Sequence, residues 1–190
     1  MVTKRVIWLV RHGERIDNIN PDWKTTAKRW DDPPLSERGV VQAGEVGLRL
    51  LQEDISHAIC SPFTRCVQTI TEILNYRKNK PKILIEPGLG ESLNACNDPP
   101  GRPVLEEILE ITQNVDTSYA PVFSVLPPEQ GGDAGCSSRI EYTVLKLLER
   151  FPTGNILLVS HGSPIAASHL ALMGSWNYVG LCTIGKEIRI

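Results

Sequence analysis

The stretch Val6-Ile7-Trp8-Leu9-Val10-Arg11-His12-Gly13-Glu14-Arg15 turns from apolar to charged at its midpoint. Residues 6–10 form a short apolar run without strict alternation, which is typical of a strand that is covered on both faces of a sheet. The charged half begins where that strand would end. Because ligands bind at the carboxyl ends of strands in parallel α/β sheets, the stretch predicts both a buried strand and a ligand site that follows it.

Outward from this stretch, strand-like and helix-like segments alternate along the chain. Short apolar runs at residues 58–60, 83–85 and 156–159 predict three more strands. Helical spacing of apolar residues predicts helices over residues 40–51 with Ser36 as N-cap, over 66–74 behind Ser61-Pro62, over 140–151, and from Ser163-Pro164 to an end at Gly174. This order predicts an α/β fold with a mostly parallel central sheet.

The chain shows no internal repeat, low-complexity tract or linker, so we expect residues 1–190 to form a single domain. Stretches rich in proline and glycine at residues 94–102 and 121–135 predict loops around a site. Together with 41% hydrophobic and 22% charged residues, this organisation is typical of a globular protein with a substantial core.

Charge and hydropathy exclude several classes of partner. The formal net charge of −2 argues against binding to nucleic acid or to an anionic membrane surface, because both require an excess of basic residues. No apolar run approaches the roughly 18 residues needed to span a bilayer, and the start does not resemble a signal peptide, so we expect a cytoplasmic protein. The five scattered cysteines predict reduced thiols.

Three polar motifs follow predicted strands and should meet at one edge of the sheet. They are Arg11-His12-Gly13-Glu14-Arg15, Ser61-Pro62-Phe63-Thr64-Arg65 and Ser160-His161-Gly162. The guanidinium groups of Arg11 and Arg65 match the spacing of phosphoryl oxygens, and Arg15 offers a third group. Helix N-termini at the same edge would add N–H donors for an anion. We therefore expect a pocket for a dianion such as a phosphate monoester.

His12 and His161 each precede a glycine at a strand end, where the backbone can approach a ligand closely. A neutral imidazole can attack phosphorus if its other nitrogen is held as a donor, while a protonated one stabilises charge on the phosphoryl oxygens. We assign attack to His12 and stabilisation to His161. Glu91, after the third predicted strand, is our general acid for the leaving oxygen, with Glu86 as its competitor.

The same motifs carry a resemblance to a known family. Arg11-His12-Gly13, the Leu-Ser-Glu-Arg-Gly run at 35–39, Ser61-Pro62 with Arg65, and Ser160-His161-Gly162 resemble the phosphoglycerate-mutase-like histidine phosphatase superfamily over nearly the whole chain. Residues 11–15, 32–36, 65–69 and 159–163 are similar to the phosphatase domains of the T-cell ubiquitin-ligand proteins (suppressors of T-cell receptor signalling) and of insect ecdysteroid phosphatase. The resemblance implies a three-layer sandwich.

The resemblance also implies an activity and a set of roles. The activity is metal-independent hydrolysis of a phosphomonoester, with phosphotyrosine and steroid phosphates as candidate substrates. The implied roles are a nucleophile at His12, a phosphate pocket of Arg11, Arg15, Arg65 and His161, and a proton donor at Glu91. The sequence departs from the subgroup in a short insert after Arg15 and in Ser92, where the subgroup carries an aromatic residue. We also expect no ubiquitin-associated or SH3 module.

Two other patterns point to different chemistry and are less favoured. Cys96 and Arg102 have the Cys-x5-Arg spacing of cysteine-based tyrosine phosphatases, but Pro99 and Pro100 remove two backbone donors from the loop that would hold phosphate. A metal site of His12, His161 and Glu91 is conceivable, but the adjoining arginines would repel a divalent cation. We expect no metal and no cofactor.

Three functions remain open from the sequence. The first is hydrolysis, the second is a phosphoglycerate-type mutase that uses the same His12, and the third is a catalytically weak phosphate-binding relative. The expected partner is a phosphorylated small molecule or a phosphoprotein, without nucleic acid or membrane, and the sequence leaves a homodimer open.

Overall fold

The computed structural model describes residues 5–189, and five strands in this part form one sheet. The strands are β1 (Arg5–Arg11), β2 (His57–Cys60), β3 (Ile83–Ile85), β4 (Ile156–Ser160) and β5 (Ile184–Arg189). Their order is β3-β2-β4-β1-β5, and β5 runs antiparallel to β1 while the other neighbours are parallel. The predicted α/β class with a mostly parallel sheet is confirmed.

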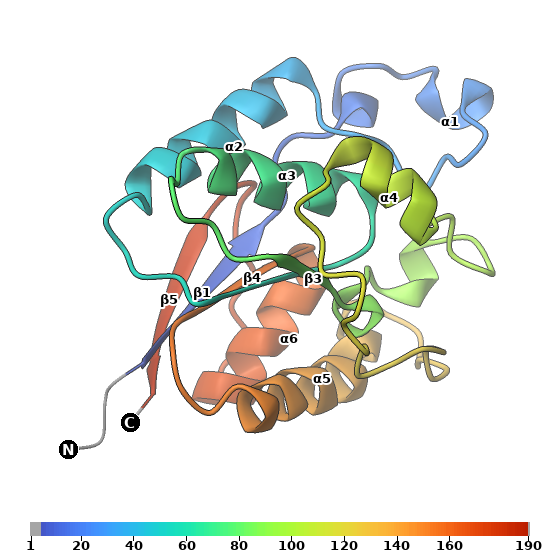
Figure 1. The fold of residues 1–190 in the computed structure, drawn as a ribbon. Coiled ribbons are helices and arrows are strands. Elements are labelled where there is room, and N and C mark those ends of the chain that lie inside the picture. The colour runs from blue at the N-terminus through green and yellow to red at the C-terminus, as the bar shows by residue number, and fades with distance from the viewer. Residues whose placement is uncertain (1–4, 190) are drawn as a thin grey trace.

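Helices cover both faces of the sheet and make three layers. They are α1 (Trp23–Thr26), α2 (Glu37–Arg49), α3 (Thr64–Asn75), α4 (Leu105–Ile111), α5 (Ser137–Arg150) and α6 (Gly162–Met173). Figure 1 shows α2 and α3 above the sheet and α5 and α6 below it. No helix in the described part of the chain is both long and apolar enough to cross a membrane.

Strand β1 shows why the strands of this sheet correspond to continuous apolar runs in the sequence. Its side chains alternate between two buried clusters, so that Trp8 and Val10 pack with residues of α2 and α3. Ile7 and Leu9 pack on the other face with residues of α5 and α6. Since both faces are covered by helices, both sets of side chains must be apolar.

Some elements were not predicted, and β5 is the clearest of them. Residues 184–189 carry Gly185, Lys186 and Glu187, which interrupt the apolar pattern that marks the other strands. β5 is an edge strand with one neighbour, and edge strands commonly tolerate glycine and charge. The short helices α1 and α4 also lie in stretches to which no element was assigned.

The helix ends agree with the prediction in two cases and differ in one. Ser36 caps α2 by accepting a hydrogen bond from Gly39 N at 3.0 Å, and Gly174 ends α6 with a left-handed φ of 74°. The predicted cap of α3 by Ser61-Pro62 is wrong. The carboxylate of Asp32 accepts hydrogen bonds from the backbone N and the hydroxyl of Thr64, at 2.8 and 2.6 Å, and so satisfies the first backbone donor of α3.

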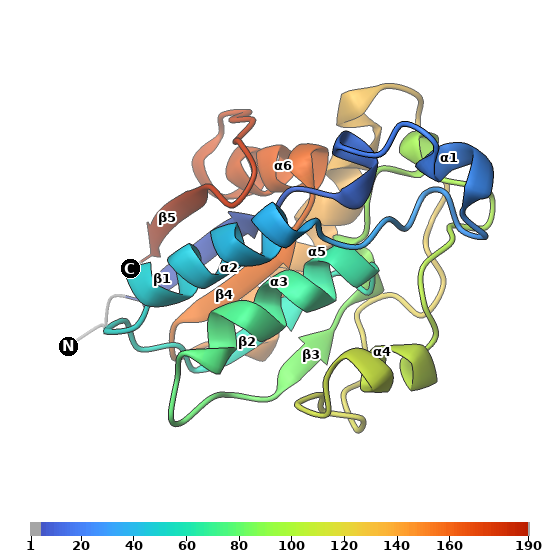
Figure 2. The same cartoon turned by 90° about the horizontal axis from the view of Figure 1, so that it is seen from above.

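The register of β1 against β4 brings the two histidine motifs together. Arg11 pairs with Ser160 at the ends of these neighbouring parallel strands, so His12 and His161 both follow at the same level of the sheet. The backbone N of His12 donates to Ser160 O at 3.0 Å and continues the ladder past the strand end. Seen from above in Figure 2, β1 and β4 lie inside the sheet, with β5 and β3 at its edges.

Candidate active site

His12 is almost fully buried, and its two ring nitrogens have different surroundings. Nδ1 lies 2.8 Å from the carbonyl oxygen of Gly13, which accepts but cannot donate, so Nδ1 carries the proton of the neutral ring. Nε2 is buried and has no hydrogen-bond partner among residues 5–189. The ring therefore presents an unshared electron pair on a nitrogen that no other group engages.

His161 lies beside His12 and is held from two sides. The ring centroids of the two histidines are 5.3 Å apart, and the rings meet edge to face. The hydroxyl of Ser61 lies 2.8 Å from Nε2 of His161, while the Glu91 carboxylate lies 3.4 Å from Nδ1. We had predicted Ser61 to cap a helix, and no local pattern indicates its contact with His161, because the two residues are about 100 positions apart.

Arg65 enters the site from the first turn of α3 and is 1% exposed. One of its terminal nitrogens, Nη1, donates to Asp31 O at 3.1 Å and lies 3.8 Å from Asp32 Oδ1. The other, Nη2, lies 3.5 Å from Glu91 Oε2, and Nε is buried without a partner in the described chain. The guanidinium is therefore fixed in orientation and keeps donor capacity for an anion.

The two carboxylates that competed as general acid have different surroundings. Glu86 is 0% exposed and accepts hydrogen bonds from Gly88 N, Tyr119 Oη and Val122 N, so its oxygens hold loops in place. Glu91 is partly open, with 13% of its side chain exposed, and its Oε2 faces His161 and Arg65. This geometry favours Glu91 as the acid, although its role stays a prediction.

Arg11 and Arg15, the other two predicted phosphate ligands, lie at the margin of the cluster that His12, His161, Arg65 and Glu91 form. Arg11 stacks its guanidinium 5.0 Å from the ring centre of Tyr178 and donates from Nη1 to Val179 O at 2.9 Å, while its Nε is buried without a partner in the described chain. Arg15 makes a two-pronged ion pair with Asp17, both contacts at 2.8 Å. Arg15 is therefore partly neutralised, and of the three arginines Arg65 lies most directly in the site.

The glycines after the two histidines have a different explanation from the one that we expected. A Cβ on Gly13 would lie 2.5 Å from Gly39 O, and one on Gly162 would lie 2.3 Å from the hydroxyl of Tyr178. Both glycines thus allow other parts of the protein to pack closely behind the histidines. Close approach to a ligand is not needed to explain them.

The contact between Gly39 and the loop after β1 leads to a stability prediction. A Cβ on Gly39 would lie 2.1 Å from Glu14 O, so Gly39→Ala must push α2 away from this loop. We expect the free energy of unfolding, measured by urea denaturation, to fall by about 1–3 kcal/mol, although alanine is the better helix former. Gly131→Ala is the control, because a Cβ there meets nothing within 4 Å. An equal loss in both variants would contradict the packing explanation.

Burial and positive charge together control the protonation of the two histidines. Burial lowers the pKa of His12 well below its ordinary value, Arg65 lowers it further, and the hydrogen bond to Gly13 opposes this only in part. Burial, then Arg65 and His12, lower the pKa of His161 in the same direction. Both rings are therefore neutral at pH 7 in the protein alone, whereas we had expected a protonated His161.

The same residues could approach a metal ion, so the charges around them matter. Ligand atoms of His12, His161 and Glu91 all lie within 4.8 Å of one another. Nη2 of Arg65 lies 3.5 Å from the Glu91 oxygen that a cation would need. A divalent cation would face this guanidinium at short range, so the donor set fits a phosphoryl dianion better.

The alternative cysteine site is disfavoured by its surroundings. Burial raises the pKa of Cys96 to about 12, so its thiol is protonated at pH 7 and a poor nucleophile. Its Sγ donates to Ser92 O at 3.5 Å. Burial also lowers the pKa of Arg102, and no hydrogen bond or ion pair in the described part of the chain joins its guanidinium to this thiol.

A cavity of about 300 Å³ opens beside Arg65 and Glu91, and neither histidine lines it. Its wall is mostly charged, with Arg15, Asp17, Lys24 and Asp31 beside these two residues, while Trp30, Pro33 and Ala95 contribute apolar surface. A phosphorylated ligand could therefore place its charged end against Arg65 and an apolar part beside Trp30.

The architecture is that of the phosphoglycerate-mutase-like proteins. The crystal structure of ecdysone phosphate phosphatase from the silkworm Bombyx mori, in complex with tungstate, matches with a TM-score of 0.75 at 23% identity, covering 96% of this chain and 88% of that one. A phosphoglycerate mutase from Bacillus anthracis matches with a TM-score of 0.63 at 23% identity, covering 98% and 88%. At these identities the likeness concerns the fold.

Sequence comparison identifies the family. Residues 7–177 match the model of the histidine phosphatase superfamily, branch 1. The chain belongs to this superfamily. It is 33% identical over 211 residues to the human ubiquitin-associated and SH3 domain-containing protein A, covering 91% of this chain and 32% of that protein. It is 33% identical over 206 residues to the ecdysteroid-phosphate phosphatase of Drosophila melanogaster, covering 90% and 27%. The chain thus spans between a quarter and a third of the length of these relatives.

Proposed function

We propose that this protein hydrolyses phosphate monoesters through a phosphohistidine intermediate on His12. The observation that carries the proposal is the asymmetric setting of this ring. Nδ1 is held as a donor by Gly13 O at 2.8 Å, and Nε2 is buried without a partner in the described chain. A ring in this state is neutral, correctly oriented and nucleophilic at Nε2.

In the first step, Nε2 of His12 forms a bond to phosphorus while the ester P–O bond breaks. Glu91 gives a proton to the departing oxygen, so the alcohol leaves neutral. In the second step, water attacks the phosphohistidine, its proton returns to the Glu91 carboxylate, and the N–P bond breaks. Inorganic phosphate is released and both residues regain their starting states.

The remaining residues stabilise the charge on the phosphoryl oxygens. Arg65 supplies a buried guanidinium with a free Nε donor, and Arg11 supplies a second buried Nε. A dianion between the rings would raise the pKa of His161, because it offsets the positive field of Arg65 that lowers it. In this proposal, His161 takes up its proton when the substrate binds, and Ser61 and Glu91 keep the ring in place.

The candidate substrates are phosphotyrosine on a protein and steroid phosphates. Two observations support a leaving group with a ring or other apolar part. One relative is named for its action on ecdysteroid phosphate, and Trp30 and Pro33 contribute apolar surface to the otherwise charged cavity beside Arg65. The proposal includes a cytoplasmic location, which free thiols at all five cysteines support, and it includes neither a nucleic acid nor a membrane partner. It leaves the homodimer open.

The proposal predicts hydrolysis that needs no metal and is blocked by oxyanions. With 4-nitrophenyl phosphate as substrate, we expect unchanged activity in excess chelator, because the arginines and not a metal bind the phosphoryl group. Tungstate and vanadate should inhibit competitively.

Two results would contradict this function. One is activity that disappears with chelator and returns with a divalent ion. The other is net transfer of the phosphoryl group between phosphoglycerates at a rate above hydrolysis, which would make the protein a mutase.

A further inference from the structure

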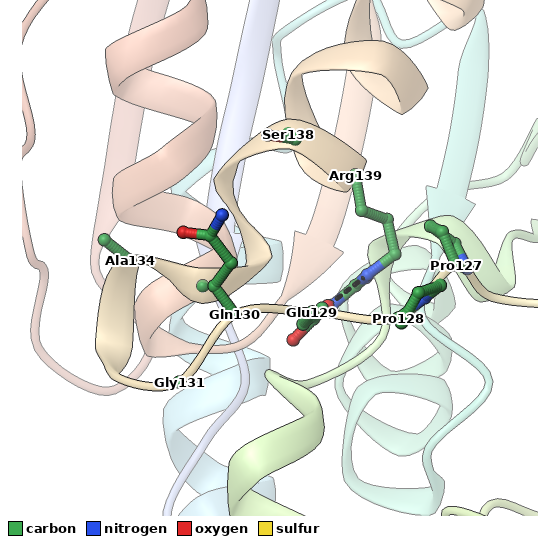
Figure 3. A pocket seen from close by; sticks show the side chains of 9 residues that line it. Pro127, Pro128, Glu129, Gln130, Gly131, Ala134, Ser138 and Arg139 are labelled. Carbon is green, nitrogen blue, oxygen red and sulfur yellow. Dashed lines mark hydrogen bonds and ion pairs between the residues drawn. The ribbon is translucent and has the colours of Figure 1, made fainter.

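A buried ion pair between Glu129 and Arg139 lies next to the segment that carries Glu91. Arg139, in the first turn of α5, is 2% exposed, and only 4% of the Glu129 side chain is exposed. Arg139 Nε donates to Glu129 Oε1 at 2.6 Å. Figure 3 shows the Arg139 side chain directed at Glu129, beside Pro127 and Pro128. Neither residue was selected in the sequence analysis.

The two terminal nitrogens of Arg139 also donate to backbone carbonyls between Gly88 and Glu91, and Nη2 in addition lies 2.6 Å from Glu129 Oε1. Nη1 donates to Gly88 O at 2.7 Å and to Gly90 O at 3.0 Å. Nη2 donates to the carbonyl oxygen of Glu91 itself at 3.0 Å. One planar guanidinium thus binds three carbonyls within four residues, which a lysine ammonium could not do with the same geometry.

Glu129 holds the backbone on the other side of Glu91. Its Oε2 accepts a hydrogen bond from Leu93 N at 2.7 Å. The intervening residue orients the acid directly, because Ser92 N donates to Glu91 Oε1 at 3.0 Å. Since Oε1 is engaged in this way, Oε2 is the oxygen that faces His161 at 3.4 Å and Arg65 at 3.5 Å.

We propose that the Glu129–Arg139 pair positions Glu91 for proton transfer to the leaving oxygen. This inference rests on the proposed function and adds two positioning residues to it. A buried ion pair contributes little net stability compared with well-packed apolar residues, so stability alone is a weak explanation for this pair. Proton transfer depends on placing the carboxylate within hydrogen-bond reach of the leaving oxygen, and a small displacement is costly.

The test uses Glu129→Gln, which keeps the shape and an acceptor for Leu93 N but removes the charge opposite Arg139. Glu129 also lines a cavity of about 390 Å³, so the substitution is not forced against packed side chains (Figure 3). The rate of phosphoenzyme formation is measured by rapid quench with an alkyl phosphate and with 4-nitrophenyl phosphate. We expect about a tenfold or larger loss with the alkyl ester and less than about a twofold loss with the nitrophenyl ester.

Arg139→Lys is the second variant, because it keeps a positive charge next to Glu129 and loses the three-carbonyl geometry. It should show the same dependence on the leaving group. Glu149→Gln is the control: Glu149 pairs with Lys146 on the exposed side of the same helix, at 2.6 Å, and its loss should leave the rate with both esters unchanged.

The outcomes separate this inference from the function on which it rests. If the wild type forms no phosphohistidine, the proposed function fails. If the wild type forms it but Glu129→Gln and Arg139→Lys slow both esters by the same factor, the pair is structural and the positioning role is overturned. A selective loss with the alkyl ester, together with unchanged tungstate affinity, supports the positioning role.

Discussion

We expect His12→Ala to lose about 10⁴-fold or more of the turnover of 4-nitrophenyl phosphate, because the substitution removes the group that forms the covalent intermediate. In the wild type, rapid quench with labelled substrate should trap phosphate that survives base and is lost in acid, as expected for phosphohistidine. The variant should trap none. The measurement is the label recovered per mole of protein, together with kcat.

His57→Ala is the matched control. His57 stacks on Phe151, with ring centroids 4.4 Å apart, and its Nε2 lies 3.1 Å from Thr153 O, away from the site. Its loss should leave the amount of trapped label unchanged. Recovery of the wild-type label on a serine or a cysteine would contradict the assignment of the nucleophile.

The second large effect should be a loss in the rate of phosphoenzyme formation by Glu91→Gln with an alkyl phosphate as substrate. An alkoxide leaves poorly without a proton, so we expect phosphoenzyme formation to slow by about 10²- to 10⁴-fold. A nitrophenolate leaves readily, so the loss with 4-nitrophenyl phosphate should be much smaller. The ratio of the two losses, measured by rapid quench, separates a general acid from a carboxylate that only holds a loop.

Glu86→Gln tests the competing assignment. The carboxylate of Glu86 accepts hydrogen bonds from Gly88, Tyr119, Val122 and Phe123, so its substitution should lower stability and affect both esters to the same extent. If Glu86→Gln instead shows the dependence on the leaving group, then Glu86 is the acid. If Glu91→Gln slows both esters equally, Glu91 supports the pocket in another way.

Much of the fold was predictable because its signals are local. The four predicted strands are buried on both faces, and continuous apolar runs mark them, the edge strand β3 included. The other edge strand, β5, was missed because Gly185, Lys186 and Glu187 interrupt such a run. The cap at Ser36 acts within its own helix and was predicted correctly. The cap of α3 was not, because Asp32 reaches Thr64 from a distant part of the chain.

The candidate site likewise has features that local sequence predicts and features that it does not. Polar residues directly after β1, β2 and β4 are visible in the sequence, and parallel strands bring their carboxyl ends to one edge, so His12, Arg65 and His161 could be selected as a group. Their protonation could not be predicted, because burial and the field of Arg65 act only in the assembled site and lower the pKa of both rings.

The residues at the sheet edge are predictable from the sequence, since short apolar runs and the residues that follow them are neighbours along the chain. The contacts that each side chain makes there depend on how the whole chain packs. The Ser61 hydroxyl contacts His161, and hydrogen bonds surround the Glu86 carboxylate, whereas that of Glu91 faces Arg65. Arg139 donates to the carbonyls of Gly88, Gly90 and Glu91. Apart from the Glu86–Gly88 hydrogen bond, these contacts join residues tens of positions apart. Strand register and helix packing, which no local pattern records, determine them.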